Sequence, residues 1–157
     1  AGKEASGTGC MKLMMNGAVT LGTMDGANVE IHQAVGDDNI FIFGMDAQEV
    51  EALKPTYSPQ TYYHNNPRIK SAIDFMRHGI NGNNFDGIIN SLVSHDPYMV
   101  LADFADYRRA QQKMVETFKD KKKWNQMMLS NIANSGRFAA DRAINEYAKD
   151  IWNAQKI

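Results

Sequence analysis

Residues 4–26 read EASGTGCMKLMMNGAVTLGTMDG, and small side chains crowd the first part of this stretch, before a single lysine, Lys12. Glycines at positions 7 and 9 allow a sharp backbone turn, because glycine adopts backbone angles that other residues avoid. Residues 10–16 are rich in helix formers, and Gly17 stands where a helix commonly ends. The stretch therefore predicts a loop that leads into a short helix over residues 10–16.

Two apolar runs lie on either side of a second helical segment. The run AVTLGTMDG, residues 18–26, contains the β-branched Val19 and Thr20, and NIFIFG, residues 39–44, has four large apolar residues before a glycine. We interpret both as strands that are buried on two faces. Residues 27–38, ANVEIHQAVGDD, have helical character. The order strand, helix, strand predicts a parallel crossover unit and an α/β fold.

The rest of the chain is predicted to be mainly helical. A loop-helix-strand-helix-strand part over residues 1–45 is thus followed by a helical part over residues 46–157. Asp46 is expected to cap the first helix of this part, and Pro55 to end it. Residues 56–67, with two prolines and three tyrosines, are predicted to be irregular. Further helices are expected over residues 68–79, 85–94, 103–118, 124–135 and 140–152.

Length and composition restrict the class of protein. With 157 residues, the chain is long enough for one compact domain with a real core. Its 17 basic and 18 acidic side chains nearly cancel, so no overall field attracts nucleic acid or an anionic membrane. No stretch approaches the ~20 apolar residues of a membrane span. Cys10 is the only cysteine, which excludes an internal disulfide and a cysteine-cluster zinc site and suits the cytoplasm. Because the chain begins without Met and with no strand before the loop, we expect its front half to be missing.

The amides of residues 6–9 allow two interpretations. At the start of a helix they can form an anion cradle, because unpaired donors and the helix dipole point the same way. An ordinary glycine turn explains the same residues. The pattern is not a nucleotide P-loop, since no Ser or Thr follows Lys12, and it lacks the third glycine of a dinucleotide fingerprint.

Lys12 also allows two interpretations. The apolar residues 13–15 follow it, so we expect part of its helix to be buried. A lysine in a partly dry site loses its charge more readily and can react with an aldehyde as a free amine. Alternatively, its stem covers apolar surface while the ammonium group stays in water. The four histidines have no metal-ligand spacing, so no metal is expected, and neither Ser6 nor Cys10 has the partners of an activated nucleophile.

Residues 4–31, EASGTGCMKLMMNGAVTLGTMDGANVEI, resemble the cofactor-lysine segment of the glycogen, starch and maltodextrin phosphorylases. The similarity continues through NIFIFGM, SHDPYMVLADFADYRRAQ and WNQMMLSNIANSGRFAADRAINEYAKDIW, and so covers almost the whole chain. This resemblance implies an α/β fold in which the chain is the C-terminal part of the second Rossmann-like lobe of a two-lobed, GT-B type glycosyltransferase. The chain would end in several α-helices, and the N-terminal lobe would be absent from it.

The resemblance also implies a cofactor. In that family the lysine of the GTGxMK motif carries pyridoxal 5'-phosphate as a Schiff base, which implies that Lys12 is the catalytic and cofactor-binding residue. Thr8 and Gly9 match the positions that hold the phosphate of the cofactor. Cys10 stands where the family usually has asparagine, and its thiol is a weaker hydrogen-bonding group than an amide.

The same family pattern implies a substrate site at Glu4, Ser6 and Gly7, which would bind the glucosyl unit that is transferred. A carboxylate accepts hydrogen bonds from sugar hydroxyls, and the adjacent amides donate to them. The implied reaction is phosphorolysis, in which inorganic phosphate cleaves a terminal α-1,4-linked glucose from a glucan and gives glucose 1-phosphate with retention. The implied partners are an α-glucan and inorganic phosphate or glucose 1-phosphate, with no nucleic acid and no membrane.

The resemblance further implies a cytoplasmic homodimer. The first lobe and the upstream basic residues of the phosphate site lie outside this chain, so we predict that the isolated chain has no phosphorylase activity. An alternative hypothesis is a structural fragment that self-associates through exposed sheet edges and binds no cofactor. The lysine-rich residues 119–123 are expected to be solvated surface.

Overall fold

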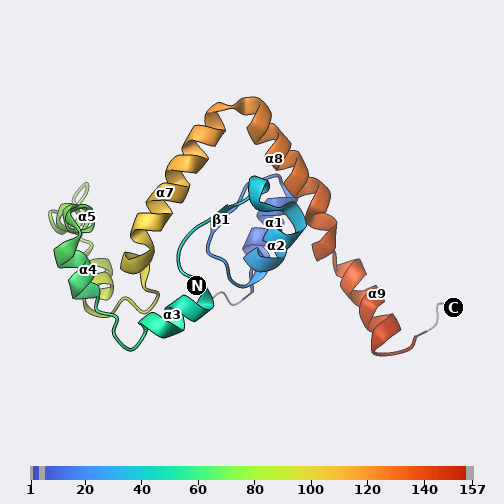
Figure 1. Cartoon of the computed structure of the whole chain (residues 1–157), viewed down its shortest axis with the longest axis horizontal. Helices are drawn as coiled ribbons and strands as arrows, with labels where there is room; N and C mark the ends of the chain where they lie inside the picture. Colours follow the sequence, from blue (N-terminus) through green and yellow to red (C-terminus); the bar gives the residue numbers. More distant parts are fainter. Residues whose placement is uncertain (1, 4–5, 155–157) are drawn as a thin grey trace.

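The computed structural model describes residues 2–3 and 6–154. In chain order its elements are α1 (Thr8–Met15), β1 (Leu21–Gly22), α2 (Ala27–Val35), the 3-10 turn η1 (Asp37–Asn39), β2 (Phe41–Ile42), α3 (Ala47–Leu53), α4 (Pro59–Asn65), α5 (Pro67–Arg77), α6 (Asp86–Asn90), the π turn η2 (Ser91–His95), α7 (Val100–Lys119), α8 (Lys121–Asn134), the 3-10 turn η3 (Ser135–Phe138) and α9 (Ala140–Asp150). The long helices α7 and α8 form an arch over α1, α2 and β1, while α4 and α5 lie at the foot of α7 (Figure 1).

The parallel crossover unit is confirmed. β1 pairs in parallel with β2, with Leu21 opposite Phe41, and α2 lies between the two strands in the chain. Both strands are shorter than predicted, and Val19 and Thr20 precede β1 rather than forming part of it. Burial on both faces was the wrong expectation for β1, whose two residues are half-buried. The physical reason is that the described part of the chain supplies a sheet of only two strands, so few elements cover it.

The prediction of an irregular segment over residues 56–67 is wrong. Helix α4 occupies most of it, and α5 begins at its last residue, Pro67. Pro59 and Pro67 are each the first residue of a helix, where the missing proline N–H is not needed and its fixed φ angle favours the helix. Asn66 then caps α5, because its side-chain oxygen accepts from the amides of Arg68 and Ile69. By contrast, the predicted cap at Asp46 is confirmed as part of a capping box with Glu49.

Asp96 explains why α7 begins at Val100 and not at residue 103. Its carboxylate is 2% exposed and accepts from the amides of Val100 (3.0 Å) and Leu101 (2.9 Å). The hydroxyl of Tyr57 donates to the same carboxylate at 2.5 Å. Burial, together with this hydrogen bond to Asp96, raises the pKa of Tyr57. The buried carboxylate therefore fixes both the start of α7 and the segment before α4.

The described residues form two separate hydrophobic clusters rather than the single core that the length suggested. One lies among α1, α2 and the residue before β2, and it consists of Met14, Ile31, Val35 and Ile40. The other lies among α4, α5, α6, η2 and the start of α7, and it consists of Tyr63, Ile69, Ile73, Ile89, Val93 and Leu101. The helix predicted over residues 140–152 is α9, and its apolar side chains Ile144 and Tyr147 are exposed. No residue of α9 is buried, and the helix projects beyond α8 (Figure 1).

A close packing contact in the N-terminal half of the chain lies between Gly7 and Ala27, the first residue of α2. Gly7 is buried and has a left-handed backbone with φ of 59°. A Cβ atom at this position would lie 2.1 Å from the Cβ of Ala27, far inside van der Waals contact. Only glycine satisfies both the backbone angle and the clearance, so the turn into α1 depends on this residue.

Replacing Gly7 with alanine is therefore expected to lower the free energy of unfolding by about 3 kcal/mol, from backbone strain and steric overlap together. Adding Ala27→Gly should remove the steric overlap and so restore part of the lost stability, while the backbone strain at position 7 remains. The matched control is Gly9→Ala, since a Cβ at Gly9 would meet no neighbour within 4 Å in the part of the chain that the structure describes. Urea denaturation measures all three variants, and a Gly7→Ala variant as stable as the unaltered chain would contradict the packing described here.

Candidate functional site

The predicted cofactor lysine lies on a helix that begins two residues earlier than the sequence indicated. Gly7 is the N-cap of α1, and Thr8 and Gly9 form the first turn. The carbonyl of Gly7 accepts from the amide of Met11 at 3.1 Å, which closes that turn. The amides of Thr8, Gly9 and Cys10 precede this bond and have no partner within the helix, as at every helix N-terminus. They are the donors that the anion-cradle interpretation requires.

The two glycines of this turn have different surroundings. Position 7 requires glycine, because any larger residue would overlap with Ala27. No such contact explains Gly9, because no atom of the described residues is found in contact within 4 Å of the position where its Cβ would stand. The open space leaves the backbone amides of the first turn accessible to a ligand. The packing thus explains the glycine at position 7 and does not explain the one at position 9.

Thr8 and Lys12 lie on the same face of α1. They are four residues apart on a continuous helix, so their side chains are neighbours along that face. The Cα–Cβ bond of a helical residue tilts toward the N-terminus, which directs the long side chain of Lys12 toward the first turn. An amine and a set of amide donors can therefore meet opposite ends of one small molecule.

The expected dry environment of Lys12 is not present in the described part of the chain. Lys12 is exposed, Leu13 and Met15 are 60% and 56% exposed, and Met14 is the buried residue of α1. The helix uses one narrow face for packing against α2 and α8, and Lys12 is not on that face. The described residues therefore do not enclose the Lys12 side chain.

Of the predicted glucosyl-binding residues, Ser6 and Gly7 directly precede α1, with Ser6 exposed and Gly7 buried. Glu4 lies outside the residues that the structure describes. Ser6, Gly7, Thr8 and Gly9 are brought together at the N-terminus of one helix, so the predicted substrate and phosphate positions adjoin each other.

The structure adds a group that sequence reasoning did not single out. The carboxylate of Asp25 accepts from the amide of Lys3 at 3.1 Å and from the hydroxyl of Thr23 at 2.7 Å. The side-chain amide of Asn28 donates to the carbonyl of Thr23 at 3.0 Å. These residues follow β1, at the carboxyl edge of a parallel sheet, where ligand sites of α/β folds occur. In the sequence, the one sign that could have identified these residues is their position directly after a predicted strand.

A cavity of about 570 Å³ lies beside this group. Its lining combines aromatic side chains with carboxylates, and comprises Lys3, Thr23, Asp25, Phe43, Tyr98, Val100, Asp103, Phe104 and Tyr107. Asp103 and Asp106 hold the chain after β2, since they accept from the amides of Met45 (2.9 Å) and Gly44 (2.8 Å). The hydrogen bond from Arg109 lowers the pKa of Asp106. α7 and the carboxyl ends of both strands thus meet around the cavity.

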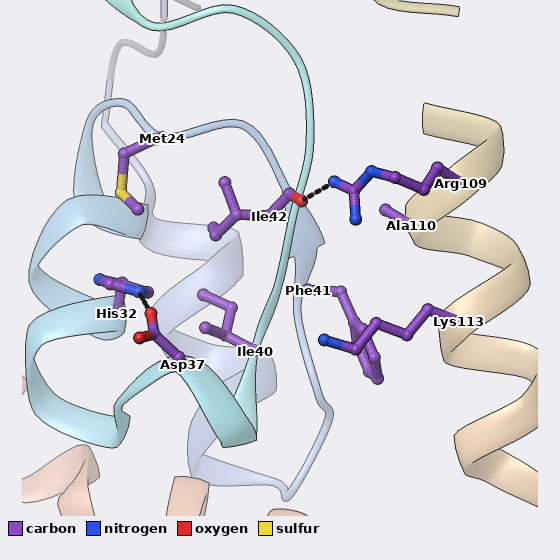
Figure 2. A pocket seen from close by; sticks show the side chains of 9 residues that line it. All are labelled: Met24, His32, Asp37, Ile40, Phe41, Ile42, Arg109, Ala110 and Lys113. Atoms are coloured by element: carbon purple, nitrogen blue, oxygen red, sulfur yellow. Dashed lines mark hydrogen bonds and ion pairs between the residues drawn. The ribbon is translucent and has the colours of Figure 1, made fainter. Parts of the chain in front are cut away.

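A second cavity, of about 290 Å³, lies among α2, β2 and α7 (Figure 2). His32 pairs with Asp37 on one side, and Arg109 donates to the carbonyl of Ile42 at 3.3 Å on the other. None of the predicted site residues lines it. Within the described ranges, no group of three or more His, Cys, Asp or Glu could hold a metal ion. No helix in the same ranges has both the length and the apolar character for crossing a membrane.

Comparison with known proteins agrees with the motif. The profile of the family described as Carbohydrate phosphorylase matches residues 1–154. The chain is 46% identical to the glycogen phosphorylase of Synechocystis sp., over 100% of this chain and 19% of that protein. It is 48% identical to the liver form of Bos taurus and 43% identical to the muscle form of Homo sapiens, each over 99% of this chain. The chain spans only 19% of the length of these relatives. It belongs to the carbohydrate phosphorylase family.

Proposed function

We propose that this chain is the cofactor-binding end of an α-glucan phosphorylase, and that Lys12 carries pyridoxal 5'-phosphate. The whole protein would cleave terminal α-1,4-linked glucose from a glucan with inorganic phosphate and release glucose 1-phosphate. The relatives named glycogen phosphorylase support this reaction. The observation that carries the cofactor assignment is the placement of Thr8 and Lys12 one turn apart on a single face of α1.

The residues of this turn fit the two ends of the cofactor. A phosphate group needs several donors and room to approach them, which the first-turn amides and the open space at Gly9 provide. An aldehyde needs an accessible amine, and Lys12 is exposed on the same face as the hydroxyl of Thr8. When bound, the cofactor supplies a phosphate group for acid–base chemistry at the sugar phosphate.

The chain's own residues bind and orient in this proposal. The amides of Thr8 and Gly9 and the hydroxyl of Thr8 hold the phosphate group, with charge-assisted hydrogen bonds and the helix dipole acting together. Lys12 holds the opposite end and so fixes the direction of the cofactor. Ser6 and the amide of Gly7 orient the glucosyl unit beside the phosphate, and Glu4 accepts from the sugar hydroxyls.

Residues outside this chain would exclude water from the site, because Lys12 is exposed among the described residues. A water-excluded site strengthens the electrostatic interactions on which phosphate chemistry depends. We further propose that this chain belongs to the second lobe of a two-lobed GT-B fold, in a cytoplasmic homodimer, and that the remainder of the polypeptide completes the site.

A second candidate is a structural fragment that binds no cofactor and associates with itself. The observation in its favour is the edge of β1 that faces away from β2, for which the described residues supply no third strand. Such edges pair readily with other chains. It differs from the first candidate in predicting no selective reaction at Lys12.

Treatment with pyridoxal phosphate followed by borohydride should modify Lys12 selectively, because the first-turn amides bind the phosphate group and so place the aldehyde beside this amine. Mass spectrometry locates the modified residue, and excess inorganic phosphate should suppress the modification by occupying the same amides. Lys12→Ala should remove the signal, whereas Lys113→Ala, at another exposed lysine, should not. Equal labelling of many lysines would favour the structural fragment.

In the complete polypeptide that contains this chain, Lys12→Ala should abolish release of glucose 1-phosphate from an α-glucan, since the cofactor loses its attachment. The isolated chain should release none even with the cofactor added, because it lacks the rest of the site. A coupled assay for glucose 1-phosphate measures both. Full activity of the Lys12→Ala enzyme would contradict the proposal.

A further inference from the structure

We propose that Asp25 is a positioning residue, which holds the chain at Lys3 against the turn after β1. This inference rests on the proposed function, since it concerns the loop that would bind the transferred glucosyl unit. The observation behind it is that Asp25 reaches from the turn after β1 to the chain just before that loop. Its carboxylate accepts from the backbone amide of Lys3 at 3.1 Å.

The segment at Lys3 has a second attachment. Its ammonium group lies 5.3 Å from the ring centroid of Tyr98, within the range of a cation–π interaction. Tyr98 is 63% exposed and lines the same cavity as Lys3. The backbone of Lys3 is thus held by Asp25 and its side chain by Tyr98, and both contacts place Lys3 beside the 570 Å³ cavity.

Asp25 is itself held in place. The hydroxyl of Thr23 donates to the other carboxylate oxygen at 2.7 Å, and the side chain of Asn28, which is 6% exposed, donates to the carbonyl of Thr23. Asn28 belongs to the first turn of α2, and Thr23 directly follows β1. The carboxylate therefore stands on the strand and the helix of the crossover unit, which are rigid elements.

Lys3 and Gly7 are both in contact with the same short segment, residues 25–27. Asp25 holds the chain at Lys3, and Ala27, two residues later, contacts Gly7. Residues 23–28 therefore hold the described chain at both Lys3 and Gly7. Hydrogen bonds to a sugar require donors and acceptors to be placed within a fraction of an ångström, so loss of one anchor should reduce turnover.

The variants distinguish the hydrogen bond between Asp25 and the Lys3 amide from the negative charge of Asp25. Asp25→Ala removes the acceptor for the Lys3 amide. Asp25→Asn keeps one oxygen that can accept from this amide and should restore most of the activity. Thr23→Val removes the hydroxyl that orients the carboxylate, and Thr23→Ser retains it. The matched control is Asp38→Ala, at an exposed carboxylate on η1.

The test measures kcat, KM for the glucan, cofactor content and thermal midpoint in the complete phosphorylase. Asp25→Ala should lower kcat by about 10- to 100-fold, with cofactor content and thermal midpoint unchanged, because misplacement of a reacting group acts mainly on the chemical step. Thr23→Val should lower kcat by a smaller factor, while Asp25→Asn, Thr23→Ser and Asp38→Ala should stay near the unaltered enzyme.

Two results would overturn the inference. One is an Asp25→Ala enzyme with kcat within about twofold of the unaltered enzyme, which is smaller than any positioning effect. The other is a parallel loss of cofactor and thermal stability, which would make the role purely structural. Either result leaves the proposed function intact as long as Lys12→Ala is inactive. A complete enzyme that releases no glucose 1-phosphate in any form would instead overturn the proposed function, and with it this inference.

Discussion

Between the turn that enters α1 and the first residue of α2 there is room for a hydrogen atom but not for a methyl group. A Cβ at Gly7 would stand 2.1 Å from the Cβ of Ala27, and the backbone of Gly7 is left-handed. This contact brings the start of α1 against the helix of the crossover unit. It therefore determines where the amides of Thr8 and Gly9 point and on which face Lys12 emerges.

The crossover unit serves as the base for this arrangement. β1 leads into the turn at residues 23–26. In that turn, the carboxylate of Asp25 accepts from the backbone amide of Lys3. One face of α1 is used for packing through Met14, and another is left for Lys12. The proposed cofactor anchor would thus combine a rigid base with an exposed side chain, and the rest of the polypeptide would enclose it.

Local patterns in the sequence predicted the elements whose causes are themselves local. The capping box at Asp46 and the strand-helix-strand order needed only neighbouring residues, and both are confirmed. The segment over residues 56–67 was mispredicted, because prolines that break a helix internally also start one at its first position. The exposure of Lys12 depends on which face of α1 packs, and the contact of Asp25 with Lys3 spans 22 residues, so neither could be read from spacing. The family itself was predictable from the motif around Lys12.

The central claim is that the first turn of α1 holds a phosphate group while Lys12 holds the same molecule by its other end. A crystal structure of the complete enzyme with pyridoxal phosphate tests this most directly. The account predicts phosphate oxygens within hydrogen-bond distance of the amides of Thr8 and Gly9, with continuous electron density from the cofactor to the Nζ atom of Lys12. A cofactor attached to another lysine, or a phosphate bound away from this turn, would contradict it.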